Sequence, residues 1–207
     1  HWLIIPAYGA AGPAPEGTLY FVGANVSYSL GGELQETAVV PDSIYVRPMP
    51  LLFLDYFLPV DVNADNPFTL PVEPSEPFTL GVRVANQGLG PAVNLKINSS
   101  QPKIIENELG LLIAFEIIGS NVNGSAVEPT LLIDFGDIAP STAGIGRWFM
   151  ISSLQGKFVE FTATFTHADA LGGELTSLLE EVNTHWLVHD VLVDLPGRDA
   201  VLDFLAD

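Results

Sequence analysis

Short segments whose hydrophobic residues recur at every second position dominate the chain. Residues 77–92 show this pattern most clearly, as a strand that runs into a turn. The apolar positions of the strand are Phe78, Leu80, Val82 and Val84. The turn contains Asn86, Gly88, Gly90 and Pro91, and a second strand follows at residues 93–97. The stretch therefore predicts the centre of a β-sandwich.

The same periodicity predicts strands on both sides of this stretch. Residues 19–30 and 33–40 are joined by Gly31 and Gly32, which accept the positive φ angles of a tight hairpin. Further strands are expected at residues 44–46, 51–58, 111–118, 131–135, 146–151, 157–167 and 184–195. One short helical turn is expected at residues 177–180, because Ser177 and Glu180 have capping-box spacing.

These elements predict an all-β fold with little helix, an immunoglobulin-like antiparallel β-sandwich. The Pro-rich connector around Pro48 indicates a boundary. Residues 1–47 then form an N-terminal β module or part of a preceding β domain, and residues 48–195 form the sandwich. Residues 196–207 are expected to be a linker or the start of a further module.

Charge and composition exclude several classes of function. The 207 residues include 25 acidic and 7 basic ones, a formal net charge of -18, so we expect no nucleic-acid partner. The chain has no Cys, which excludes disulfides and cysteine nucleophiles. No apolar run approaches about 18 residues, so no membrane insertion is expected. The chain begins at His1 without a signal peptide, and we expect a processed form or a segment of something longer.

Two motifs carry a family resemblance: Pro77-Phe-Thr-Leu-Gly-Val-Arg-Val-Ala-Asn-Gln-Gly-Leu-Gly-Pro-Ala92, and Phe135-Gly-Asp-Ile-Ala-Pro140 followed by the strand at Trp148. Together they resemble the CARDB-like bacterial group of immunoglobulin-like β-sandwiches, which are named for an association with cell adhesion. The chain is also similar to segments of large, repetitive bacterial surface proteins. The likeness implies a secreted, modular, adhesive or structural role and transfers no catalytic residue. The long loop at residues 59–77 departs from the short form of such domains.

That loop carries a candidate calcium site. Its proposed ligands are Asp61, Asn63 and Asp65. Oxygen ligands at alternate positions can wrap a Ca²⁺ ion. The full EF-hand pattern is absent, because Asn66 stands where it requires Gly and Val72 where it requires Glu. A different calcium loop would borrow Glu73 or Glu76, and the alternative is a solvated polar turn.

The histidines offer other metal sites. His185 and His189 can share an ion on a helix, with Glu181 one turn earlier, whereas four residues of a strand cover roughly 13 Å. The β-branched residues around them favour the strand. His1 raises a second possibility, because the chain resembles copper monooxygenases in being a β-sandwich that begins with His. In those enzymes, which act on polysaccharides, that residue binds copper beside a second His, here His167, His185 or His189.

Three other sets of residues are candidates for function. Paired carboxylates suited to glycoside hydrolysis are offered by Glu160, Asp169, Asp190 and Asp194, although 25 acidic residues produce such pairs by chance. Glycosylation sequons occur at Asn25, Asn98 and Asn123, and they matter only on a glycosylating secretory route. Aromatic residues that would stack on sugars, or pack against a neighbouring module, are Tyr8, Tyr20, Tyr28 and Trp186.

The sequence thus favours a non-enzymatic extracellular module of a cell-surface or filament-forming protein, structural or adhesive in role. We expect it to act through strand-edge contacts with other copies of itself or with neighbouring modules, at residues 2–5 and 185–193. No cofactor is required. The first alternative is a calcium- or carbohydrate-binding module, with Ca²⁺ or glycans as partners. The second alternative is a copper-dependent polysaccharide monooxygenase that uses His1.

Overall fold

The chain folds into strands. The computed structural model describes residues 3–7, 9–99, 103–104, 113–160, 163–166 and 178–207, and none of these residues lies in a helix. The part of the chain that the structure describes accordingly contains no helix able to cross a membrane. The prediction of an all-β sandwich is confirmed, while its immunoglobulin-like character stays a prediction.

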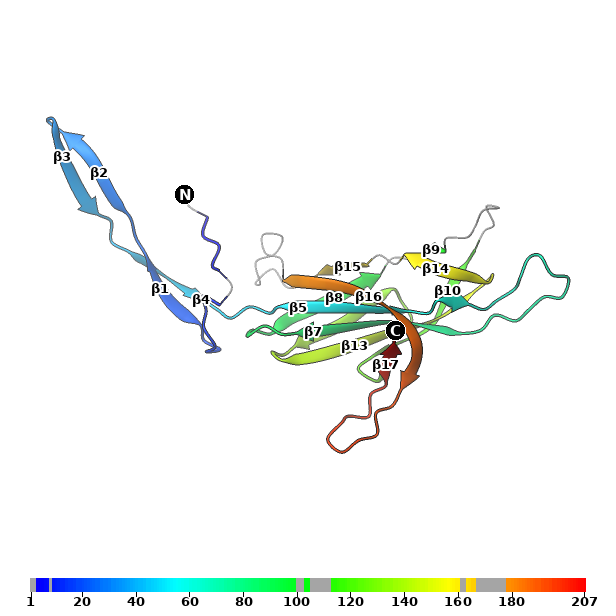
Figure 1. The fold of residues 1–207 in the computed structure, drawn as a ribbon. Helices are drawn as coiled ribbons and strands as arrows, with labels where there is room; N and C mark the ends of the chain where they lie inside the picture. The colour runs from blue at the N-terminus through cyan, green and yellow to red at the C-terminus, as the bar shows by residue number, and fades with distance from the viewer. Residues whose placement is uncertain (1–2, 8, 100–102, 105–112, 161–162, 167–177) are drawn as a thin grey trace.

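A two-stranded ribbon at residues 18–46, which we call the arm, projects from one end of the molecule (Figure 1). Its strands are β1 (Thr18–Val22), β2 (Asn25–Leu30), β3 (Glu33–Ala38) and β4 (Asp42–Val46). β1 pairs with β4 at the base, and β2 pairs with β3 at the tip. Gly31 and Gly32 close the tip with φ angles of 64° and 89°, as the predicted hairpin requires.

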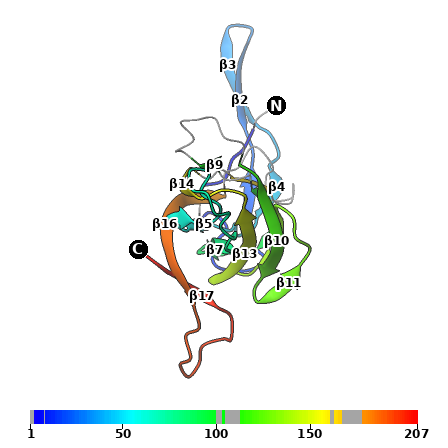
Figure 2. The same cartoon turned by 90° about the vertical axis from the view of Figure 1, so that its right-hand side faces the viewer.

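The remaining strands build a β-sandwich. The larger sheet has the order β11-β10-β13-β7-β5-β16-β17. Its strands are β5 (Leu52–Leu58), β7 (Phe78–Asn86), β10 (Phe115–Val122), β11 (Ser125–Val127), β13 (Thr142–Ser152), β16 (Leu179–Val191) and β17 (Asp203–Ala206). The second sheet, of order β12-β8-β15, comprises β8 (Ala92–Ser99), β12 (Leu132–Ile138) and β15 (Ala163–Thr166). The short strands β6 (Asp61–Val62), β14 (Gly156–Glu160) and β9 (Lys103–Ile104) pair in that order. Figure 2 shows the curvature of the larger sheet seen along its strands.

Apolar side chains from both sheets fill the space between them. The larger sheet contributes Leu52, Leu54, Leu80, Val82, Val84, Trp148 and Met150. The second sheet contributes Leu95, Ile97, Ile133, Phe135 and Ile138. The strand expected at residues 77–86 therefore forms with its predicted apolar face turned to the core. Each fully buried side chain of this size stabilises the fold by about 1.5–3 kcal/mol relative to exposure.

The turn after this strand connects the sandwich to the segment that leads from the arm. Asn86 is 1% exposed, and its amide nitrogen donates to the carbonyl oxygens of Gly90 and Ile138 at 2.9 and 3.1 Å. Its Oδ1 accepts from the backbone N–H of Leu51 at 3.2 Å. A Cβ added to Gly90 would lie 2.1 Å from the carbonyl oxygen of Pro48, so only glycine allows this close approach.

Three local expectations need correction or completion. The sandwich is not wholly antiparallel, because β16 runs parallel to β5. The chain reaches β16 from β15 of the second sheet, and it enters the larger sheet in the direction of β5. The expected helical turn is wrong at Leu179 and Glu180, which belong to β16. Residues 196–207, expected to be a linker or a further module, contribute β17, which pairs with β16 rather than leaving the sheet.

Candidate functional site

The arm exposes large apolar side chains along its whole length. They are Leu19, Tyr20, Phe21, Val26, Tyr28, Leu30, Leu34, Val39, Val40 and Tyr45. Phe21 has 70% of its surface exposed and Val40 has 87%. Every residue of β2 and β3 is exposed, so neither face of the tip is packed against another layer. An isolated two-stranded ribbon is marginally stable at best, so the exposed apolar side chains make the arm a candidate contact surface.

Strand β2 gives the arm a regular apolar face. Its side chains alternate between polar and apolar, and successive side chains of a strand point to opposite faces. The apolar face carries Val26, Tyr28 and Leu30. Leu34 of β3 pairs with Ser29 and lies on the opposite face. β2 contains no charged residue, which is unusual in a chain of net charge -18.

The base of the arm packs on the loop that precedes it. A Cβ on Gly17, which has a φ angle of 82°, would lie 2.2 Å from the carbonyl oxygen of Val46. The hydroxyl groups of Thr18 and Tyr20 donate to carbonyl oxygens of the preceding loop, each at 2.6 Å. Val46 and Ala11 are buried at this junction. The arm is therefore anchored at one end only.

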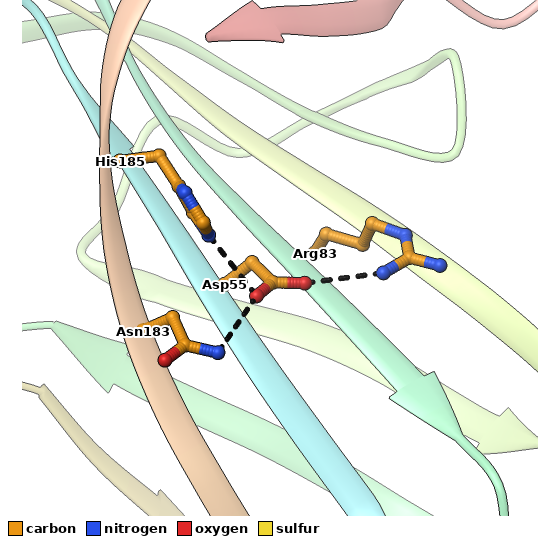
Figure 3. A network of polar contacts seen from close by, with 4 residues as sticks. All are labelled: Asp55, Arg83, Asn183 and His185. Atoms are coloured by element: carbon orange, nitrogen blue, oxygen red, sulfur yellow. Dashed lines mark hydrogen bonds and ion pairs between the residues drawn. The ribbon is translucent and has the colours of Figure 1, made fainter. Parts of the chain in front are cut away.

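A polar cluster joins three neighbouring strands on the outer face of the larger sheet (Figure 3). Asp55 of β5 accepts from Arg83 of β7 through Oδ2 at 3.1 Å. Its Oδ1 lies 3.4 Å from Nδ2 of Asn183 and 3.2 Å from Nε2 of His185, both on β16. The ring of His185 also stacks on Phe57, with centroids 5.2 Å apart. These contacts hold β5, β7 and β16 together. Each described partner of the Asp55 carboxylate therefore helps to position these strands.

A buried arginine attaches the C-terminal strand to the same sheet. Arg147 of β13 is 2% exposed, and its Nε donates to Oδ1 of Asp190 at 2.9 Å. Its Nη2 donates to the carbonyl oxygen of Leu202. The guanidinium carbon lies 4.3 Å from the ring centroid of Phe204, a cation–π contact. Asp190 accepts a further bond from Thr79 at 3.2 Å. The ion pair and the hydrogen bonds thus compensate for the burial of the Arg147 charge.

Phe204 of β17 occupies the space that Gly81 leaves open. A Cβ on Gly81 would lie 2.3 Å from Cζ of Phe204, so any larger residue collides with the ring. The ring also stacks on Phe57 with centroids 4.3 Å apart. The outer face of the sheet is therefore covered here by the chain's own C-terminal strand.

The first two proposed calcium ligands have partners within the protein. Oδ1 of Asp61 lies 3.8 Å from Nζ of Lys157, and both side chains are 60% exposed. The Nδ2 of Asn63 donates to Oε2 of Glu76 at 2.8 Å, which links the two ends of the loop. Glu76, one of the acids that a calcium loop would borrow, thus contacts a proposed ligand.

The third proposed ligand organises the loop backbone. Oδ1 of Asp65 accepts from the N–H of Glu73 at 2.9 Å, and Oε2 of Glu73 accepts from the N–H of Asn66 at 2.9 Å. These reciprocal bonds explain why the loop needs carboxylates at both positions. Among the residues that the structure describes, no group of three or more His, Cys, Asp and Glu side chains could hold a metal ion. Calcium binding stays a prediction.

A cleft of about 430 Å³ lies beside this loop. Its lining includes Asp61, Asn63, Phe68, Ile113 and Lys157. Phe68 is 72% exposed, so an aromatic ring stands near carboxylate, amide and ammonium groups. This combination suits a small polar ligand with an apolar face, such as a sugar.

The histidines are spread over different parts of the chain. His1 and His167 lie outside the described residues, so the copper arrangement stays untested. His185 belongs to the Asp55 cluster, and His189 is exposed further along the same strand. Both lie on β16 and not on a helix, as their β-branched neighbours favoured. A metal ion shared by these two histidines and Glu181 would require a helix, so the strand does not provide the geometry for it.

The remaining candidates take separate places. Of the carboxylates, Asp190 binds Arg147, Asp194 follows β16, and Asp169 and the side chain of Glu160 lie outside the described residues. Among the aromatics, Tyr20 and Tyr28 lie on the arm, Trp186 lies on β16, and Tyr8 lies outside the described residues.

The three sequons are all exposed. Asn25 begins β2, and Asn98 lies on β8. Asn123 lies in the turn between β10 and β11 with a φ angle of 50°. Its Oδ1 accepts from the N–H of Ile145 at 2.8 Å, so its amide already fixes the turn. Use of the sequons stays a prediction.

Arg147 and Asp55 were not predicted to organise the sheet. A signal existed for both, since Arg147 interrupts the apolar strand at residues 146–151 and Asp55 interrupts the one at 51–58, where a charge needs a partner. The identity of the Asp55 partners had no local signal, because they lie 28 and about 130 positions away. No family model, curated protein or solved structure matches the chain. The CARDB-like resemblance therefore stays a prediction.

Proposed function

We propose that the chain is a non-enzymatic structural or adhesive module of an extracellular or cell-surface protein, one that assembles through strand contacts with other copies or with neighbouring modules. The observation that carries the proposal is the arm, an apolar ribbon exposed on both faces and anchored at one end. Leu3, Ile4 and Ile5 form a second exposed apolar segment beside it. Burial of such surfaces drives association.

The network on the outer face of the sandwich supports a scaffold role. Asp55, Arg147 and their partners hold strands in place, which gives a rigid body on which an arm can be mounted. The net charge of -18 makes copies of the protein repel one another, so association requires specific contact surfaces.

Sedimentation velocity and electron microscopy of the full chain test this proposal. We expect concentration-dependent association into oligomers or filaments, and dissociation when Phe21 and Tyr28 are both changed to Ser. A chain that stays monomeric at every concentration, with the arm resistant to proteases, would contradict the proposal.

The cleft beside residues 59–77 favours a second candidate, a calcium- or carbohydrate-binding module. Asp61 and Phe68 contribute to its lining. This function predicts a rise in melting temperature with Ca²⁺ that shrinks when Asp61 and Asp65 are changed to Ala. A melting temperature unmoved by Ca²⁺, together with no retention on a glycan array, would exclude it.

A further inference from the structure

The core-facing side of β16 is partly uncovered. In the parallel pair, Val182 lies opposite Leu54 and Trp186 lies opposite Leu58, and residues paired in this way point to the same face of a sheet. Leu54 and Leu58 are buried in the core, yet Val182 is 51% exposed and Trp186 is 41% exposed. The strip ends there, because the register of β16 against β17 shifts between Leu187 and His189.

The second sheet ends on the side where this strip is exposed. Its order is β12-β8-β15, and β12 packs against β13 and β10, so β15 lies on the side of β5 and β16. Among the described residues, β15 pairs only with β8. Its outer row of N–H and C=O groups can therefore accept another strand. We call the open edge of β15, together with Val182 and Trp186, the seam.

We infer that the seam receives β2 from the arm of a second copy of this chain. Backbone hydrogen bonds between β2 and β15 extend the second sheet by the two strands of the arm. In this arrangement the apolar face of β2 covers the apolar strip of β16. The inference rests on the proposed function and specifies the surface that the arm meets.

The charges of the two surfaces favour a second copy as the occupant. β2 carries no charge, and neither does the sequence of β15, so two chains of net charge -18 can meet there without placing acids together. The arm has three acids, Glu33, Glu36 and Asp42, and no Lys or Arg. Of the lysines, Lys96 and Lys157 are already paired with Asp134 and Asp61 of their own chain, so the contact relies on the uncharged strands and not on ion pairs.

The arm exposes apolar area on both faces, and Tyr28 is the exposed aromatic residue that lies on β2. The arm exposes four aromatic side chains, each of which offers about 150–250 Å² when fully accessible. At their exposures of 40% to 70% they present roughly 400 Å². The aliphatic residues of the arm add to this area, and a standard interface buries about 800 Å² per partner.

The geometry favours an open chain of copies. The arm points away from the sandwich that carries it, as Figures 1 and 2 both show, so β2 does not reach the seam of its own copy. Donor and acceptor surfaces lie on different parts of one chain, which makes the contact heterologous. Such contacts generate filaments when they do not close into a ring.

A mixing experiment with two variants tests the pairing. Tyr28→Asp places a charge on the apolar face of β2, and Val182→Asp places one in the seam. We expect each variant alone to weaken association by roughly 30-fold or more, the size of an interface hot spot. In a mixture, the intact arm of the Val182→Asp chain enters the intact seam of the Tyr28→Asp chain, so 1:1 dimers form in sedimentation velocity.

Two matched controls separate charge from position. Leu34→Asp adds the same charge to the opposite face of the arm, and Val127→Asp adds it to exposed β11; both should assemble like the unchanged chain. Circular dichroism and thermal unfolding establish that each variant folds. If Val182→Asp fails to fold, Trp186→Asp replaces it in the mixture.

The outcomes distinguish this inference from the proposed function. If the unchanged chain stays monomeric, both fail. If the unchanged chain assembles but the two variants assemble equally well, or stay monomeric when mixed, the pairing of arm and seam is overturned and the proposed function survives. A mixture that forms 1:1 dimers supports both.

Discussion

The sandwich and the arm are built from the same kind of amphipathic strand, yet they bury their apolar residues very differently. In the sandwich, Val82 and Val84 alternate with polar or small residues and lie fully buried between two sheets. In the arm, Val26 and Tyr28 alternate with serines in the same way and remain exposed. The difference teaches that the arm has the alternation of a core strand, yet no layer of the described chain covers it. Substitutions in the sandwich should therefore lower the free energy of unfolding, whereas substitutions in the arm should weaken association.

The sharpest contrast is between Trp148 and Phe21. Trp148 is 1% exposed in the core, so Trp148→Ala should lower the free energy of unfolding by about 3–5 kcal/mol. Phe21→Ala on the arm should change it by about 0.5 kcal/mol or less, and should weaken association instead. Urea unfolding of dilute samples measures the first effect, and sedimentation measures the second. Equal losses of stability at the two positions would remove the distinction.

Asn86 tests the junction between the two regions. Its side chain bonds to the backbone of Leu51, Gly90 and Ile138, so Asn86→Ala leaves buried N–H and C=O groups without partners. We expect a loss of about 2–4 kcal/mol in the free energy of unfolding. Asn121→Ala, which removes one bond to the N–H of Gly124 beside an exposed turn, is the matched control with a loss of about 1 kcal/mol. A smaller loss at Asn86 than at Asn121 would contradict this account of the junction.

Gly81→Ala tests how tightly the C-terminal strand covers the outer face. The added methyl group collides with Phe204, and overpacking of this kind costs about 1–3 kcal/mol. The cost should shrink in a Phe204→Ala background, because the ring that causes the clash is gone. A double-mutant cycle by chemical denaturation measures the coupling. Additive costs would show that Phe204 does not occupy the space above Gly81 in solution.

The smallest effect concerns alkaline pH. Burial raises the pKa of Tyr56 from 10.0 to about 12, because the phenolate is disfavoured in the core. A pKa raised on folding gives stability that is complete below pH 10 and is lost as the pH rises from 10 to about 12. The free energy of unfolding should therefore fall over this window, and less steeply in Tyr56→Phe. Identical slopes for the two chains would refute the assignment.

The strands were predictable to the extent that local pattern determines them. Gly31 and Gly32 specify a hairpin by their φ angles, and the alternation at residues 78–84 specifies a strand with one buried face. The pairing of β16 with β5 was not predictable, because it joins residues about 130 positions apart and depends on the whole sandwich. The alternation of polar and apolar residues also does not reveal whether another layer covers the apolar face. The exposure of the arm was therefore seen only in the structure.

The candidate sites show the same limit. The alternation of Asp61, Asn63 and Asp65 was visible, but their bonds to Lys157, Glu76 and the backbone of Glu73 depend on how the loop folds back. The cluster around Asp55 draws on three strands, so the lone charge within residues 51–58 was visible but its partners were not. Strand-edge contact was predicted at residues 185–193, and one residue of the seam, Trp186, lies in that range.

Hydrogen exchange of β2 as a function of protein concentration tests the central claim most directly. In β2, the amides that point away from β3 have no partner within the described chain, so they exchange rapidly in a dilute monomer. If a second copy covers the arm, the protection of these β2 amides rises with protein concentration. The protection of the β15 amides rises with it, whereas that of the β11 amides does not. Protection of β2 that stays constant while the chain assembles would contradict the account.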